Sequence, residues 1–316
     1  MLSTNLKIHA LVFGLGILIP FSTFAQDKKK KEIPAPERLE LKTTDNVNLI
    51  CTYFGGTNEK ETVPIILLHD IGGSRNELIP FAEVLQKSFG YAVIVPDLRG
   101  HGESKTTVTN QPIDVSKFRK EEYATFNEDI SCCFRYLRDE ANNKGKANID
   151  SLVIVSAGSI CINAVAWTLQ DYSYPPIRGK KQGQFVKGLV MLSPRKSIKG
   201  FSIVSLLKLP LFSGKGAVPI PLIVAMGGSD RKIIADGKSI HKSLSRTRPK
   251  VDDIADQAER LKKQTLFFME FSNFSGTEIV RSINKTNFHN ILADFVRLKV
   301  EANSDDHPWV DYTKKE

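Results

Sequence analysis

Two stretches of the sequence decide the fold, LLHDIGGS at positions 67–74 and VPDLRGHGES at positions 95–104. Each begins with the last residues of a short apolar run and continues into a segment rich in glycine and polar residues. Short, continuous apolar runs bounded by such turns are typical of strands that are buried on both faces of a sheet. The two stretches therefore predict two buried strands that each end in a sharp turn.

Similar runs recur along the chain and alternate with helical patterns. The apolar runs lie at 65–68, 92–95, 152–155, 189–192, 222–225 and 266–269. The helical patterns lie at 78–86, 126–137, 160–169 and 288–296. This alternation predicts one α/β domain with a doubly wound, mostly parallel sheet and right-handed connections. An antiparallel hairpin of residues 39–41 and 47–54 precedes it. The insertion at 200–219 is too short for a full cap domain.

The N-terminus has the features of a secretory signal peptide. Lys7 supplies the positive charge, residues 11–21 the apolar region, and residues 23–25 the small-x-small cleavage site. A retained transmembrane anchor is the alternative, but glycines and a proline interrupt the apolar run, which is short for a bilayer span. We expect an exported protein, periplasmic or secreted, with no membrane span after cleavage.

The expected division of the chain is a signal peptide (1–25), a charged tether (26–37), one domain (38–303) and a polar tail (304–316). With 41% hydrophobic and 25% charged residues among 316, the composition is that of a soluble globular protein. The four cysteines, Cys51, Cys132, Cys133 and Cys161, lack the spacing of a disulfide framework or metal site and are predicted to be core residues. No metal or cofactor is predicted.

The net charge of +9 is scattered along the chain. No zinc-finger, helix-turn-helix or RNA-binding pattern accompanies it, so nucleic acid is excluded as a partner. The expected partner is a small molecule or an envelope ligand. A weaker hypothesis is that an anionic envelope polymer binds the basic run at 28–31 and the loop with Lys180 and Lys181.

The two opening stretches together resemble the early half of the α/β-hydrolase superfamily, in its lipase-like and serine-aminopeptidase-like branch. There one strand ends in His-Gly-x-x-Gly-Ser and the next in Asp-x-Arg-Gly-His-Gly-x-Ser. The resemblance implies that the N–H of Ile71 is an oxyanion donor and that His69 and His101 have structural roles. Asp70 departs from the pattern, because it replaces a glycine and puts negative charge near a developing anion.

The nucleophile of the family lies in Gly-x-Ser-x-Gly, at a strained turn between a strand and a helix. Here the corresponding segment is LVIVSAGSIC at 152–161, and counting from the last apolar strand residue places Gly158 at the position of the nucleophile. Glycine adopts such a turn readily but offers no hydroxyl group. Ser156 and Ser159 are the two alternatives, and Ser159 is the better one because small residues flank it.

The acid and the base of the triad differ in how well they are retained. Asp230 follows the run at 222–225 and matches the acid, although it is also a common turn residue. The base should follow the run at 266–269, but Ser275 stands there. Of the six histidines, His289 is the only later one inside the domain.

Two hypotheses follow. The pattern is similar to a group of exported bacterial α/β-hydrolase-like proteins with a degenerate triad, which implies a catalytically inactive protein that serves as an envelope binding or scaffold module. The alternative is a serine hydrolase, an esterase or a peptidase, with a displaced triad of Ser159, Asp230 and His289.

Overall fold

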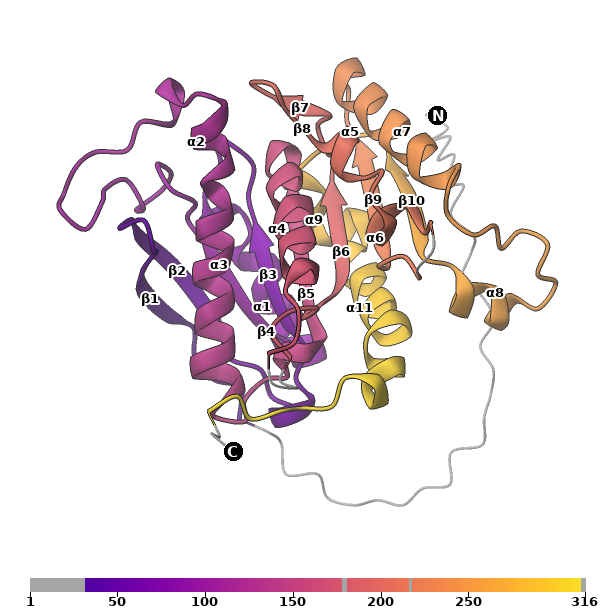
Figure 1. The fold of residues 1–316 in the computed structure, drawn as a ribbon, viewed down its shortest axis with the longest axis horizontal. Helices are drawn as coiled ribbons and strands as arrows, with labels where there is room; N and C mark the ends of the chain where they lie inside the picture. The colour runs from indigo at the N-terminus through magenta and orange to yellow at the C-terminus, as the bar shows by residue number, and fades with distance from the viewer. Residues whose placement is uncertain (1–31, 178–180, 216–217, 314–316) are drawn as a thin grey trace, which may run out of the picture.

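The structure, a computed structural model, describes residues 32–177, 181–215 and 218–313. The predicted signal peptide and residues 26–31 of the tether lie outside these ranges. An eight-stranded sheet with the order β1-β2-β4-β3-β5-β6-β9-β10 forms the centre of the molecule (Figure 1). Its strands are β1 Glu37–Lys42, β2 Asn48–Phe54, β3 Pro64–Leu68, β4 Ala92–Pro96, β5 Leu152–Ala157, β6 Val186–Leu192, β9 Leu222–Gly227 and β10 Leu266–Phe271.

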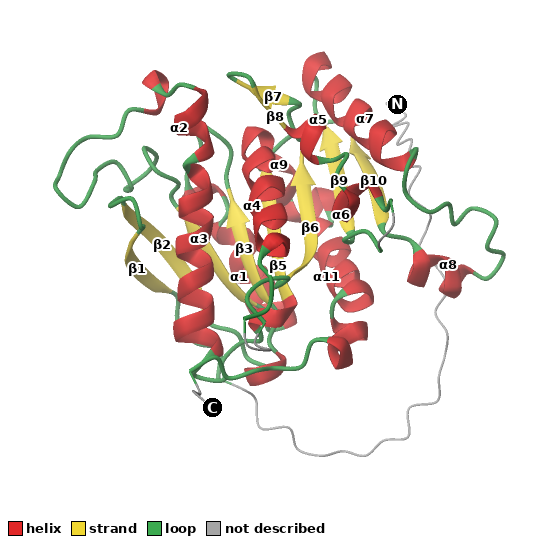
Figure 2. Ribbon diagram, viewed as in Figure 1, coloured by secondary structure: helices red, strands yellow, loops and turns green. Residues whose placement is uncertain are grey.

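In this sheet β3, β4, β5, β6, β9 and β10 run parallel, and β1 and β2 form the antiparallel hairpin at one end (Figure 2). Each predicted apolar run lies in one of the strands. Alternate side chains of β3, such as Ile65 and Ile66, enter separate cores on the two faces of the sheet. The doubly wound, mostly parallel architecture and the N-terminal hairpin are therefore confirmed.

Helices cover both faces of the sheet (Figure 1). One face carries α2 Lys120–Ala124, α3 Phe126–Tyr136, α4 Cys161–Ser173, α5 Ile203–Leu206, α6 Pro210–Ser213 and α7 Arg231–Ser245. The other carries α1 Ile79–Phe89, α9 Glu278–Arg281, α10 Ile283–Thr286 and α11 Phe288–Lys299, with α8 Gln257–Lys263 beside α11. None of the helices in the described residues is both long and apolar enough to cross a membrane.

The insertion between β6 and β9 is short, as predicted. It contains the two-stranded ribbon of β7 Ser197–Ile198 and β8 Phe201–Ser202, followed by α5 and α6. In the described part of this segment there is no cap domain. The four cysteines are buried and unpaired, which confirms their prediction as core residues.

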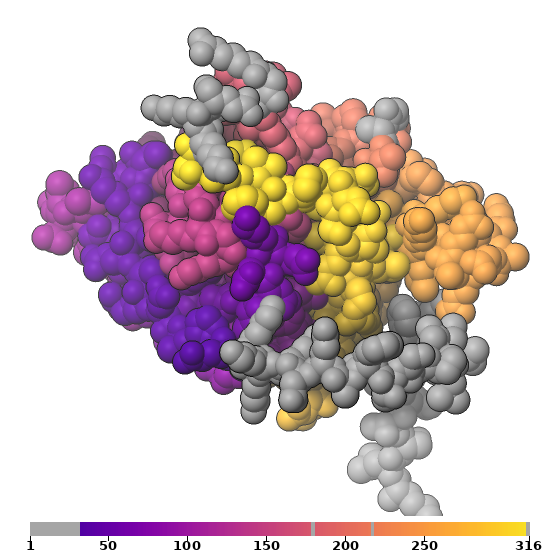
Figure 3. All heavy atoms as spheres, turned by 90° about the horizontal axis from the view of Figure 1, so that it is seen from below, coloured from indigo at the N-terminus to yellow at the C-terminus, as the bar shows by residue number. Residues whose placement is uncertain are grey.

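The residues after 303 lie against the domain. The side chain of Asn142 donates a hydrogen bond to the carbonyl of Val310 (2.8 Å), and the indole N–H of Trp309 donates to the carbonyl of Asn142 (3.0 Å). Lys60 lies over the Trp309 ring. The C-terminal segment runs past the edge where the parallel strands begin (Figure 1), and it lies on the surface in the view from below (Figure 3). The segment predicted to be a polar tail thus has specific partners along residues 307–312.

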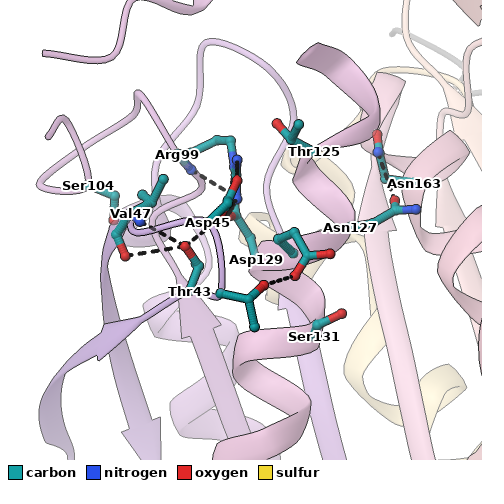
Figure 4. A network of polar contacts seen from close by, with 12 residues as sticks. Thr43, Asp45, Val47, Arg99, Ser104, Thr125, Asn127, Asp129, Ser131 and Asn163 are labelled. Atoms are coloured by element: carbon teal, nitrogen blue, oxygen red, sulfur yellow. Dashed lines mark hydrogen bonds and ion pairs between the residues drawn. The ribbon is translucent and has the colours of Figure 1, made fainter. Parts of the chain in front are cut away.

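A buried ion-pair network ties the hairpin to the parallel part of the sheet (Figure 4). Arg99, in the loop after β4, donates through Nε (2.9 Å) and Nη2 (2.8 Å) to Asp129 Oδ1 on α3. It also donates to Asp45, in the turn between β1 and β2. The side chain of Asp129 is fully buried, whereas that of Asp45 is 37% exposed. Asp129 is therefore the partner that contributes most to stabilising the buried charge of Arg99.

We expect Asp129→Ala to lower the free energy of unfolding by about 3–5 kcal/mol, because it leaves the Arg99 guanidinium buried beside an empty site. Asp45→Ala is the matched control. It should cost only about 1 kcal/mol, because this pair is partly exposed and Arg99 keeps Asp129. Urea denaturation of both variants measures the two losses. Equal losses would contradict the assignment of Asp129 as the main partner.

Candidate functional site

The turn between β5 and α4 lies at the carboxyl edge of the sheet, where the family resemblance places the nucleophile. β5 ends at Ala157, and one turn of 3-10 helix, Gly158–Ile160, leads into α4. Gly158 has a φ of +56°, in the left-handed region that side chains other than glycine adopt at a cost. The backbone position that would strain any other residue is thus occupied by glycine, which has no side chain.

The space above Gly158 holds the side chain of Asp70. A β-carbon built at Gly158 would lie 1.8 Å from Asp70 Oδ2, far inside van der Waals contact. Asp70 reaches this position because it follows β3, which pairs directly with β5. The carboxylate therefore fills the space where the side chain of a nucleophile would begin.

The same carboxylate engages two backbone donors. Asp70 Oδ1 accepts hydrogen bonds from the N–H of Ile71 and the N–H of Ser159, both 2.8 Å long. In enzymes of this type, one N–H from the loop after the first parallel strand and one from the residue after the nucleophile form the oxyanion hole. Ile71 and Ser159 occupy these two positions relative to Gly158. An internal carboxylate oxygen thus accepts from both of the N–H groups that the family resemblance predicts for an oxyanion hole.

The electrostatics of Asp70 reflect competition between burial and hydrogen bonding. Burial raises the pKa of the Asp70 carboxyl above its ordinary value of 3.8. The N–H groups of Ser159 and Ile71 act in the opposite direction and do not cancel the shift. The negative charge of nearby Glu77 favours the protonated form, and the positive charge of Arg195 favours the ionised form.

The two alternative serines have different surroundings. Ser156 is buried within β5, and its hydroxyl donates to the carbonyl of Val190 on the neighbouring strand (3.2 Å). The hydroxyl of Ser159 is half-buried and forms no hydrogen bond within the described part of the chain. Only Ser159 therefore has a hydroxyl that is free of other partners.

The predicted acid and the residue at the base position lie on neighbouring loops. Asp230 is exposed and caps α7, with Oδ1 accepting from the N–H groups of Lys232 (2.7 Å) and Ile233 (3.1 Å). These N–H groups lower the pKa of its carboxyl. A β-carbon at Gly228 would lie 2.8 Å from Cβ of Ser275, so the loops after β9 and β10 touch. The retained acid now serves as a helix cap.

His289 lies on α11 with its ring 6.4 Å from that of Phe89, centroid to centroid. Phe89 ends α1 just before β4 begins, whereas Ser159 follows the carboxyl end of β5. Because β4 and β5 are both parallel to β3, these two positions are at opposite edges of the sheet. Among the described residues, no hydrogen bond joins any two of Ser159, Asp230 and His289. The structure does not assemble the displaced triad.

His69 and His101 bind backbone turns, as predicted. His69 Nε2 accepts from the N–H of Leu98 (3.0 Å), and its Nδ1 lies 2.7 Å from the carbonyl oxygen of Asp70. His101 Nε2 accepts from the N–H of Gly72 (2.9 Å). Burial lowers the pKa of His69 to about 4, so this imidazole is neutral near pH 7. The two rings thus bind the backbone of the loop that carries Asp70 and hold it in position.

The residues of the weaker, basic-surface hypothesis are only partly described. Lys181 forms an ion pair with the buried Asp150. Lys180 and the run at 28–31 lie outside the described ranges. Among the described residues there is no group of three or more metal-ligating side chains.

The comparisons with known proteins agree with the fold. Residues 63–194 match the family described as "alpha/beta hydrolase fold". An esterase of Pyrococcus furiosus is similar over 84% of this chain and 93% of its own (TM-score 0.55, 12% identity). A dienelactone hydrolase from Anabaena variabilis is similar over 84% of this chain and 99% of its own (TM-score 0.55, 14% identity). An esterase of Pyrobaculum calidifontis covers 87% of each chain (TM-score 0.54, 11% identity). No curated protein matches the sequence.

Substitution of Gly158 tests the overlap with Asp70. We expect Gly158→Ala to destabilise the protein by about 1–3 kcal/mol more than Gly276→Ala, because a buried overlap adds to the backbone strain. Gly276 is a matched control: its φ is +54°, and nothing lies within 4 Å of a β-carbon built there. Urea denaturation measures both costs, and Asp70→Gly should remove the excess. Equal costs at the two glycines would refute the overlap.

The raised pKa of Asp70 predicts a dependence of stability on pH. In the unfolded chain this carboxyl ionises near 3.8, whereas in the folded chain it ionises at a higher pH. The folded state therefore holds the extra proton within this window, and the stability contributed by Asp70 falls as the pH rises through it. Asp70→Asn keeps the acceptor oxygen without the charge. The unfolding free energy of the wild type minus that of Asp70→Asn should decrease between about pH 4 and pH 7. An increase over this range would contradict the assignment.

Proposed function

Since this chain is a protein of the α/β-hydrolase fold, we propose that it is a non-catalytic member which acts by binding, as an exported binding or scaffold module of the cell envelope. Loss of chemistry leaves the scaffold of the fold in place, and a scaffold of this kind serves functions other than hydrolysis. The proposal concerns what this chain does, whereas the activities named for the similar structures belong to those proteins.

The observation that carries the proposal is the position of the Asp70 carboxylate. It occupies the site of the nucleophile side chain above Gly158 and engages the two N–H groups that would stabilise an oxyanion. One donor of an oxyanion hole is worth roughly 10²–10³ in kcat, so its occupation by a carboxylate is costly. The missing hydroxyl at Gly158 and the missing imidazole at Ser275 would each lower the rate of hydrolysis further.

The alternative is a serine esterase or peptidase that uses Ser159, Asp230 and His289. It has in its favour a Ser159 hydroxyl without another partner. Against it, His289 lies beside Phe89, and the N–H of Ser159 is bound to Asp70. This alternative requires α11 and the loop of Asp70 to rearrange together, which makes it the second choice.

The proposed export rests on the N-terminal sequence. A positive residue, an apolar region and a small-x-small site are the features of a cleaved signal peptide, and the Lys-rich segment after it suits a solvated leader of the mature domain. Its expected ligand is a small molecule or a component of the envelope.

An active-site probe separates the two functions. We expect no labelling of the protein by a fluorophosphonate and no hydrolysis of p-nitrophenyl esters above the buffer rate, because no activated serine is present. A commercial serine esterase confirms that the probe is reactive. Labelling that disappears in both Ser159→Ala and His289→Ala, but persists in Ser156→Ala, would establish the alternative and end the proposal.

A further inference from the structure

A cavity of about 320 Å³ lies between α5 and α7, away from the turn at Gly158. The two helices lie side by side on the same face of the sheet (Figure 1). The volume falls at the lower end of the range for small-molecule sites. The cavity thus has room for one small ligand.

The floor and the rim of this cavity differ in chemistry. Val204, Leu207 and Ile240 supply the apolar part, and Leu207 and Ile240 belong to the buried core of that face. Both are almost fully buried and held in place by the packing of the domain, so most of the accessible apolar surface of the floor comes from the half-buried Val204.

The polar part comes from one side of α7. Ser239, Lys242, Ser243 and Arg246 recur at intervals of three and four residues, which places their side chains in one row along the helix. This row stands beside the apolar floor. The cavity therefore has an apolar bottom with cations and hydroxyl groups along one wall.

The polar groups of this wall have no partners within the described chain. Lys242 and Arg246 form none of the ion pairs found there, and the hydroxyls of Ser239 and Ser243 form no hydrogen bond. The nearby carboxylates are already engaged, Asp236 with Arg195 and Glu270 with Lys238. No carboxylate lines the cavity. Two unpaired cations next to a fixed apolar floor make a site that is complementary to an anion with an apolar body.

We infer that the cavity between α5 and α7 binds a small amphipathic organic anion, with its charged head at Lys242 and Arg246 and its apolar body against Val204 and the accessible edges of Leu207 and Ile240. A free carboxylate with a short aliphatic chain is the ligand to which we commit, because a volume of about 320 Å³ suits a small molecule. This inference is independent of whether the turn at Gly158 is catalytic.

Calorimetric titration with sodium octanoate, below its micelle concentration, tests the inference on the complete protein. We expect saturable binding that weakens as the salt concentration rises. Sodium acetate, which lacks the apolar chain, and octyl glucoside, which lacks the charge, should each bind at least about tenfold more weakly, since each loses one of the two contributions.

Paired substitutions locate the site. Lys242→Gln with Arg246→Gln should weaken octanoate binding about tenfold through the loss of two charge contacts. Arg281→Gln with Lys285→Gln is the matched control. It removes two cations at the same spacing beside a different cavity, of about 380 Å³, on the opposite face, and should leave the affinity unchanged.

Several results would overturn the inference. These are octanoate binding no tighter than acetate, wild-type affinity in the α7 variant, and an equal loss in the control variant. Sedimentation with phosphatidylglycerol vesicles separates a lipid surface from a free ligand. Vesicle binding that depends on Lys242 and Arg246, without octanoate binding, would replace the free anion by a membrane lipid.

Discussion

The direct pairing of β3 with β5 is the constraint on which the site depends. Their register places Leu68 opposite Ser156, so the residues that follow the two strands emerge side by side. Asp70 and Gly158 each stand two residues beyond this pair, and at that spacing the carboxylate of one enters the space above the other. The missing side chain at Gly158 and the added carboxylate at Asp70 are therefore two halves of one contact, and each is accommodated by the other.

The strands were predictable because each carries its own signal. Continuous apolar runs specify strands that are buried on both faces, and each of the six runs predicted between residues 65 and 269 forms a strand. The helix α7 was not predicted, because its apolar residues are sparse and Gly237 interrupts them. The structure gives the reason for this glycine: a β-carbon there would lie 2.7 Å from the sulfur of Met226. Close packing of helix on strand overrode the weak helix propensity.

The site was only partly predictable for a related reason. The sequence, through its family resemblance, predicts Asp70 and Ile71 in the oxyanion loop and Gly158 at a turn without a nucleophile, since these predictions need only position along the chain. Where a carboxylate points does not follow from position. The sequence suggested only that Asp70 adds negative charge near the site, whereas the structure shows it bound by two N–H groups. The capping role of Asp230 is likewise set by tertiary geometry.

The docked C-terminal segment bears on how the chain reaches its fold. The hydrogen bond between Asn142 and Val310 closes a loop of 168 residues, more than half of the chain. Contacts of such long range form late, because the entropy of closing the loop is lost before they stabilise the fold. The edge of the sheet that these residues cover stays open until residues 307–312 have been synthesised. A chain that lacks residues 307–312 would keep the strand pairs of its sheet yet leave that edge exposed to solvent.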